Sequence, residues 1–345
     1  MNFARRIVPE QFALSDWDHA WSLGWFRMRQ TLFTTHFLCF ERRIYSAVWL
    51  RVGLAGFAHD KSLASLRKRN LKLRWEFSVL EGTPDEAHEE LFQRYRDGLA
   101  FEPAQTLADL LGDNNRFNTW QVDVFDGESL IASGVFDFGH RAAGGIVSYY
   151  DPSYKKYSLG RWLILEKMEF CRKQGLEWFY PGYAVPGQPR FDYKWGIGTS
   201  TLEYYDLATE SWRPYDAEAP IPDPLKEIRE RLTDLQQRLG EKGVEVPLKA
   251  YLPLDINLNP QVQGGGLFDF PLFLDCLPEP GCVPNLVAVF DPRVGRFHLL
   301  RCRSVYRLLS ASDDPTTFST DLLMMERLLF STDEVEEILT LFVKV

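Results

Sequence analysis

The feature that most constrains the fold is a run of strand and helix patterns in the middle of the chain. Between residues 120 and 124, apolar side chains alternate with polar ones, as in a half-buried strand. Asp126-Gly127 follows, and both positions of this pair tolerate the positive φ angles of a tight hairpin turn. Residues 131–138 provide the return strand, so a β-hairpin is predicted here.

The pattern continues with a strand at residues 144–150, which ends at Asp151-Pro152. Residues 159–174 carry apolar side chains at helical spacing, with Gly175 as the stop. Two more strands are predicted, at residues 176–180 and 201–207. A hairpin that leads into a strand, a helix and a strand is similar to the core of the GNAT acyltransferase fold, although several other α+β folds share it. We predict an α+β, GNAT-like fold.

The size and composition of the chain fit a globular protein. Its 345 residues, 45% hydrophobic and 25% charged, suffice for two domains or for one large domain with an appendage. No stretch reaches the ~18 consecutive apolar residues that a membrane-spanning helix needs. The first residues do not resemble a secretion signal. We therefore expect a cytoplasmic protein with no membrane partner.

Changes in composition divide the chain into three predicted regions. Residues 1–80 are rich in aromatic and basic side chains and are the candidate for binding tRNA or substrate. Residues 81–214 contain the GNAT-like pattern, and their first helix is predicted to start at Thr83-Pro84-Asp85-Glu86 with Thr83 as its cap. After a proline-rich linker, residues 215–345 form an α/β extension of unknown role, which begins with an amphipathic helix.

The charge of the chain is unevenly distributed. The net charge of −9 argues against indiscriminate binding of nucleic acid, and no DNA partner is expected. Basic residues nevertheless outnumber acidic ones between Glu41 and Arg74, and residues 61–71 are interpreted as a helix with outward basic side chains. Such a segment is either a solvated helix face or a contact for RNA phosphates, and both interpretations stay open here.

The five cysteines fit neither a zinc site nor a disulfide framework. Cys276 and Cys282 are close in sequence, but the others are scattered, so ordinary thiols are expected.

A more informative segment is the turn at Ser158 and Gly160, which opens the helix of residues 159–174. The free N–H groups at a helix start favour an anionic ligand. An ordinary capped helix explains the same residues equally well.

Several short motifs occur in a distinctive order. They are Gly24-Trp25-Phe26-Arg27, the run from Lys61 to Asn70, Tyr149-Tyr150-Asp151-Pro152, Ser158-Leu159-Gly160, Tyr180-Pro181-Gly182-Tyr183 and Tyr193-Lys194. In order and spacing they resemble the arginyl-tRNA–protein transferases and the bacterial relatives of these enzymes, which move leucine onto proteins that begin with Asp or Glu. The resemblance covers roughly residues 20 to 207.

The resemblance implies transfer of arginine or leucine from a charged tRNA to the N-terminal α-amine of a protein or peptide that begins with Asp or Glu, without a cofactor. The implied catalytic residues are Asp151, Glu166 and Tyr150. The implied substrate-binding residues are Tyr149, Ser158, Leu159, Gly160, Gly182, Tyr183, Tyr193 and Lys194. The implied tRNA-binding residues are Ser62, Ser65, Arg67, Lys68, Arg69 and Asn70.

The sequence departs from the family pattern at two places. Only Cys39 remains where the family has a cysteine cluster, so no metal is predicted. The segment from Pro181 to Val185 replaces the family's Leu-Gly-Tyr-Tyr-Ile.

Two alternatives to an aminoacyl-tRNA–protein transferase stay open. One is a GNAT-type enzyme that uses acyl-CoA, although residues 156–162 match its pyrophosphate loop poorly. The other is a non-catalytic protein that binds N-termini or tRNA.

Overall fold

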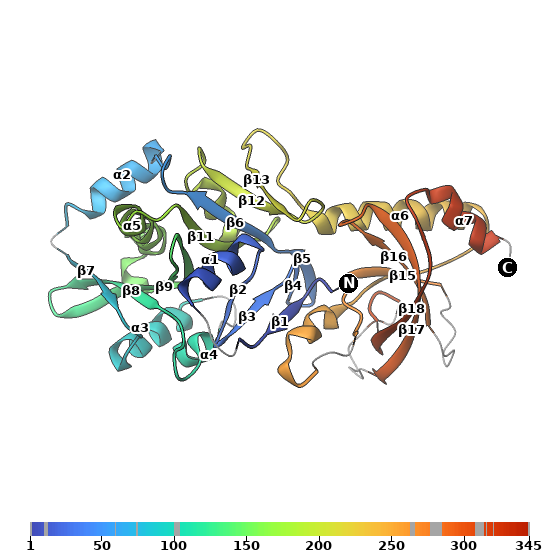
Figure 1. Ribbon diagram of the computed structural model, residues 1–345, viewed down its shortest axis with the longest axis horizontal. Coiled ribbons are helices and arrows are strands. Elements are labelled where there is room, and N and C mark those ends of the chain that lie inside the picture. Colours follow the sequence, from blue (N-terminus) through green and yellow to red (C-terminus); the bar gives the residue numbers. More distant parts are fainter. Residues whose placement is uncertain are drawn as a thin grey trace.

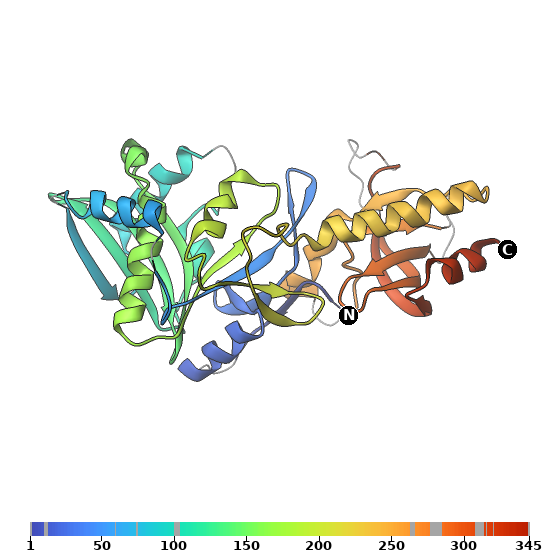
Figure 2. The same cartoon turned by 90° about the horizontal axis from the view of Figure 1, so that it is seen from above.

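The computed structural model describes residues 2–9, 13–58, 60–73, 75–99, 104–262, 266–276, 285–307, 314, 316–319 and 321–343. Figure 1 shows an elongated molecule with one large sheet at each end, and strand β1 (Arg5–Ile7) lies between them. Figure 2 shows the same two units from above, with the long helix α6 (Pro224–Glu241) crossing the second unit. No helix among the described residues is long and apolar enough to cross a bilayer.

The first unit is built on an eight-stranded sheet. In spatial order its strands are β13 (Ser211–Pro214), β12 (Leu202–Asp206), β6 (Val48–Gly53), β11 (Trp178–Ala184), β10 (Ala142–Tyr150), β9 (Ser129–Phe138), β8 (Thr119–Asp126) and β7 (Glu76–Glu81). β10 and β11 pair in parallel, and the other neighbouring pairs are antiparallel. The predicted hairpin, strand, helix and strand are therefore present, and the α+β, GNAT-like fold is confirmed.

Helices cover both faces of this sheet. Helices α2 (Lys61–Asn70) and α5 (Leu159–Lys173) share one hydrophobic core with the sheet, and α5 begins and ends within a residue of its predicted bounds. The opposite face packs against α1 (Leu14–Ser22), α3 (Glu86–Asp97) and α4 (Leu107–Leu111). Apolar side chains that alternate along each strand supply the two cores, as expected for a sheet buried on both faces.

The predicted cap of helix α3 is wrong. The helix begins at Glu86, and the side chain of Asp85, not Thr83, accepts hydrogen bonds from the N–H groups of Ala87 and His88. A carboxylate placed directly before the first helical residue satisfies two orphan donors, so it is the better cap.

Within the described residues, two small sheets and four short 3₁₀ helices complete the connections. The small sheets contain β1, β3 (Thr31–Thr34) and β2 (Phe26–Met28), and β4 (Phe37–Phe40) with β5 (Arg43–Ser46). The 3₁₀ helices are η1 (Pro152–Tyr157), η2 (Pro189–Gly196), η3 (Leu252–Leu258) and η4 (Pro260–Val262).

The second unit is a five-stranded antiparallel sheet. Its strands are β14 (Leu248–Ala250), β15 (Leu272–Asp275), β16 (Asn285–Asp291), β17 (Arg296–Arg307) and β18 (Asp321–Thr332), with α6 and α7 (Val335–Val343) packed against them. The leucine and isoleucine stripe of α6 is buried, as its spacing predicts. Cys39, Cys171, Cys276 and Cys302 are free thiols, and Cys282 lies outside the described residues.

The start of the chain is fastened to this second unit. Asp269 accepts hydrogen bonds from the backbone N–H groups of Phe3 at 2.5 Å and Ala4 at 3.1 Å. The Phe3 ring packs edge-on against Phe270. Burial raises the pKa of the Asp269 carboxyl to about 7, because removal from water disfavours its charged form.

Candidate active site in the split sheet

The parallel pair β10 and β11 separates within the sheet. Its ladder runs from Ala142↔Trp178 to Gly144↔Tyr180 and pairs no residue beyond these. The next residue of β11 is Pro181, which has no N–H to donate to a neighbouring strand. Gly182 then has φ +84°, a conformation that glycine adopts without strain. The sequence thus breaks the sheet at this point, and a cavity opens on each face.

One cavity lies on the face covered by α5 and has a volume of about 400 Å³; we call it the α5-side cavity. Three tyrosines line it: Tyr95, Tyr150 and Tyr193. Its charged lining residues are all cations, namely Lys155, Arg161, Lys167 and Lys194, with no carboxylate among the described ones. This composition favours an anionic ligand with an aromatic part.

The second cavity lies on the opposite face and has a volume of about 380 Å³; we call it the aromatic cavity. Its aromatic lining residues are Trp21, Phe26, Phe33, Trp49, Tyr183 and Phe191. Trp21 lies so close to Gly144 that a Cβ there would come within 2.6 Å of the indole, which excludes any larger residue. The charged lining is mixed and consists of Arg27, Asp109, Asp137 and Lys194.

The two cavities share part of their walls. Gly145 and Ile146 of β10, Pro181 of β11 and Lys194 of η2 line both of them. The Nζ of Lys194 donates a 2.7 Å hydrogen bond to the carbonyl of Tyr183. Burial lowers the pKa of Lys194 to about 7. Two ligands that enter from opposite faces would therefore meet at the split between the strands.

Five of the predicted site residues line the α5-side cavity: Tyr150, Ser158, Gly160, Tyr193 and Lys194. Ser158 has φ +54° and its hydroxyl forms no cap hydrogen bond with α5. A Cβ on Gly160 would meet only the ring of Tyr150, at an ordinary 3.6 Å. The turn that opens α5 is therefore accessible. Gly182 and Tyr183 line the aromatic cavity.

Four other predicted site residues line neither cavity. Asp151 caps η1 through Ser153 and lies 3.5 Å from Arg94. Glu166 accepts hydrogen bonds from Arg67 and from the Nε1 of Trp162. Tyr149 and Leu159 are buried in the hydrophobic cores. Both carboxylates, Asp151 and Glu166, already have cationic partners.

The residues predicted to bind tRNA lie on α2. Ser62, Ser65 and Lys68 are exposed. Arg67 forms a two-pronged ion pair with Glu166, and Arg69 and Asn70 donate hydrogen bonds to the carbonyl of Tyr157. These contacts fix the segment that leads to Ser158, so α2 supports the cavity mouth. Arg74, the end of the basic run, lies outside the described residues.

Replacing Arg67 by Ala should destabilise the protein by about 2 kcal/mol, because Glu166 is 6% exposed and loses both prongs of its ion pair. Urea denaturation of the variant measures this loss. Lys68→Ala is the matched control, since Lys68 is exposed on the same helix and should change the free energy of unfolding by less than about 0.5 kcal/mol. Equal effects of the two substitutions would contradict the supporting role of Arg67.

Among the charged cavity residues that sequence reasoning missed, Lys167 and Asp137 are the most buried. Lys167 is fully buried on α5, where its Nζ donates hydrogen bonds to the carbonyl of Val147 at 3.2 Å and to the hydroxyl of Ser148 at 2.9 Å. Burial lowers its pKa to about 7. The available signal was a lysine on the same helix face as Gly160 and Ile164, inside an apolar stretch. Asp137 lies inside β9, near the end of the predicted return strand, and gave no comparable signal.

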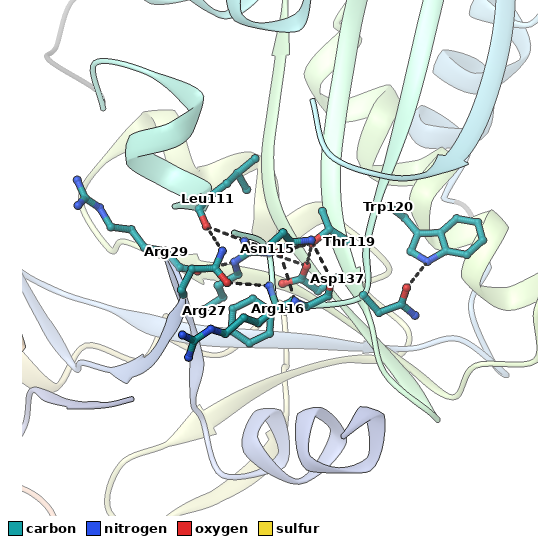
Figure 3. A network of polar contacts seen from close by, with 11 residues as sticks. Arg27, Arg29, Leu111, Asn115, Arg116, Thr119, Trp120 and Asp137 are labelled. Carbon is teal, nitrogen blue, oxygen red and sulfur yellow. Dashed lines mark hydrogen bonds and ion pairs between the residues drawn. The ribbon is translucent and has the colours of Figure 1, made fainter. Parts of the chain in front are cut away.

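Arg27, from the motif of residues 24–27, forms the polar network of Figure 3. Its guanidinium lies 2.9 Å from Asp137 and stacks on the ring of Phe117. All five of its N–H groups are used, and their acceptors are the carbonyls of Arg29 and Leu111, the Oδ1 of Asn115, the Oγ1 of Thr119 and the Oδ1 of Asp137. Arg27 therefore orders the wall of the aromatic cavity and has no donor left for a ligand.

The strand order and the split between β10 and β11 define a GNAT-like fold. Residues 79–203 match the model of the "Arginine-tRNA-protein transferase, C terminus" family, which confirms the resemblance over these residues. An aspartate/glutamate leucyltransferase of Vibrio campbellii is 25% identical over 168 residues, 48% of this chain and 70% of that protein. One of Stenotrophomonas maltophilia is 28% identical over 185 residues, 50% of this chain and 70% of that protein.

Solved structures match at lower identity. The crystal structure of FemX has a TM-score of 0.35 and 10% identity, and the match covers 58% of this chain and 69% of that one. The structure of L-PGS from Bacillus licheniformis has a TM-score of 0.33 and 13% identity, over 49% of this chain and 52% of that one.

Proposed function

We propose that this protein transfers an amino acid from a charged tRNA to the N-terminal α-amine of a protein or peptide that begins with Asp or Glu. The observation that carries the proposal is the split between β10 and β11, where a cationic cavity and an aromatic cavity share walls. The proposal also draws on the matched family and on the activity named for its relatives. We expect the protein to act in the cytoplasm, where charged tRNA is present.

In this proposal the α5-side cavity takes the loaded 3′ end of the tRNA. The basic residues that line only this cavity, Lys155, Arg161 and Lys167, attract the terminal phosphates, and a tyrosine ring can stack on the terminal adenine. The N–H groups at the start of α5 add further donors. The exposed residues of α2, Ser62, Ser65 and Lys68, are the proposed contacts for phosphates farther along the tRNA. Binding should then weaken steeply as salt rises.

The aromatic cavity takes the start of the acceptor peptide. Lys194 is the proposed partner of its acidic side chain, because Lys194 is buried and has no ion-pair partner among the described residues. An acidic side chain would supply the missing negative charge and restore the charged form of the lysine. The peptide amine would then lie at the split, within reach of the ester in the α5-side cavity.

The reaction needs alignment more than activation. The ester that joins an amino acid to tRNA is already reactive, so holding amine and ester carbon together supplies much of the rate.

The cavities also favour leucine over arginine as the transferred residue. The α5-side cavity, which takes the charged tRNA in this proposal, has no carboxylate among its described lining residues to pair with a guanidinium group.

The test is incubation of the purified protein with labelled Leu-tRNA or Arg-tRNA and with peptides that begin with Asp, Glu or Ala. We expect leucine to appear on the Asp and Glu peptides and much less on the Ala peptide. Binding of both substrates without any transfer would contradict the proposal and indicate a non-catalytic binding protein. Stabilisation by acyl-CoA but not by aminoacyl-tRNA would indicate an acyl-CoA enzyme.

A further inference from the structure

A buried carboxylate faces the aromatic cavity with one oxygen unused. Asp137 is 1% exposed but lines the cavity, opposite Gly144 in the β9–β10 ladder. Its Oδ1 accepts hydrogen bonds from the Nη1 of Arg27 at 2.9 Å and from the hydroxyl of Thr119 at 2.7 Å (Figure 3). Its Oδ2 has no hydrogen-bond partner among the described residues. A carboxylate oxygen that lines a cavity and has no partner within the fold can accept a hydrogen bond from a ligand's donor.

The surroundings of Asp137 fix its position and shift its pKa. Burial raises the pKa of Asp137, whereas the adjacent Arg27 and the hydrogen bond from Thr119 lower it. Because every donor of Arg27 is used within the fold, the guanidinium orients the carboxylate and cannot itself hold a substrate. The outcome is an oriented, desolvated carboxylate beside aromatic rings, a setting that suits a proton acceptor.

We propose that the Oδ2 of Asp137 binds the α-ammonium group of the acceptor peptide and takes its proton. This inference rests on the function proposed above. The freed amine forms a C–N bond to the ester carbon, and the C–O bond to the tRNA ribose breaks. A second proton of the former ammonium group passes to the departing ribose oxygen and completes its hydroxyl group. The amide nitrogen keeps the third proton, and Asp137 returns its own to water.

No other carboxylate described in the structure has the same combination of properties at this place. Asp109 also lines the aromatic cavity, but its side chain is 39% exposed and pairs with Arg29. Asp151 and Glu166, the carboxylates favoured by the sequence, line neither cavity. The role of proton acceptor therefore moves from α5 and its preceding loop to strand β9.

The test is the pH profile of kcat at saturating peptide for Asp137→Asn. The amide keeps an oxygen for Arg27 and Thr119 but cannot take a proton. We expect kcat at pH 7 to fall by about 100-fold. It should then recover as pH rises toward about 8, where the α-amine loses its proton unaided. Asp123→Asn is the matched control, because Asp123 is equally buried in the same sheet but lines neither cavity.

A second variant keeps the carboxylate. Thr119→Val removes one hydrogen bond to the Oδ1 of Asp137, so the pKa of Asp137 should rise and the acidic limb of the kcat profile should move to higher pH. If Asp137→Asn is folded and has a wild-type profile, or loses activity equally at every pH, the inference fails while the proposed function stands. A wild-type protein that transfers no amino acid from either tRNA overturns both.

Discussion

Gly160→Trp is expected to lower aminoacyl transfer by at least about 100-fold while the protein stays folded. Gly160 lines the α5-side cavity at the start of α5, and an indole at this position would occupy the space proposed for the tRNA end. The loss should appear mainly in the affinity for the charged tRNA. A filter-binding measurement with labelled Leu-tRNA separates this loss from a loss of the chemical step.

Gly160→Ala is the matched control for this experiment. A Cβ here meets only the ring of Tyr150, at 3.6 Å, so the methyl group fits without movement. Alanine in place of glycine within a helix also stabilises by roughly 0.5–1 kcal/mol. We expect transfer by this variant to stay within about twofold of wild type. Full activity of Gly160→Trp would remove the α5-side cavity from the proposed function.

The second large effect is expected for Lys194→Met. The substitution keeps a long apolar stem but removes the charge proposed to bind the acidic side chain of the acceptor. Loss of one partner from a buried charge pair costs roughly 2–5 kcal/mol, which is about a 30-fold or greater loss in kcat/KM for an Asp peptide. Transfer to an Ala peptide should change little, so the variant should lose its preference for acidic peptides.

The pH dependence of this preference has a defined sign. Burial lowers the pKa of Lys194 to about 7, so its charged form is lost as pH rises through that value in the free protein. The KM for the Asp peptide should therefore increase above pH 7, while the KM for the Ala peptide should not show this increase.

Lys167→Met is the matched control for Lys194→Met, because Lys167 is also buried but lines only the α5-side cavity. It should slow transfer to both peptides alike; a retained preference in Lys194→Met would exclude Lys194 as the acidic-residue contact.

The sequence was sufficient for elements whose signals are local. The Asp126-Gly127 turn, the helix of residues 159–173 and the stripe of α6 all depend on neighbours within a few residues. The start of α3 was misplaced because both Thr83 and Asp85 can cap a helix, and only the backbone geometry selects between them. The insertion of β6 between β11 and β12 had no local signal, since it depends on pairing between distant segments.

The candidate site was predicted in the same uneven way. Residues of the Ser158 turn and Lys194 were found because they belong to recognisable motifs, and the fold brings them to one cavity. Glu166 was favoured as a reactive carboxylate, but its partner Arg67 lies 99 residues away in the sequence. Asp137 was overlooked because its proposed role depends on one carboxylate oxygen that Arg27 leaves without a hydrogen bond. Contacts between residues distant in sequence therefore decide which carboxylate is free to react.

The place of β6 has a practical consequence for fragment design. β6 pairs with β11 on one side and β12 on the other, although it precedes the family-matched residues 79–203. A clone trimmed to the matched residues would leave β11 with an open, hydrogen-bonding edge directly beside the split. Unpaired strand edges of this kind promote aggregation through pairing with strands of other molecules. Recombinant pieces intended for crystallisation should therefore retain the first fifty-odd residues of the chain.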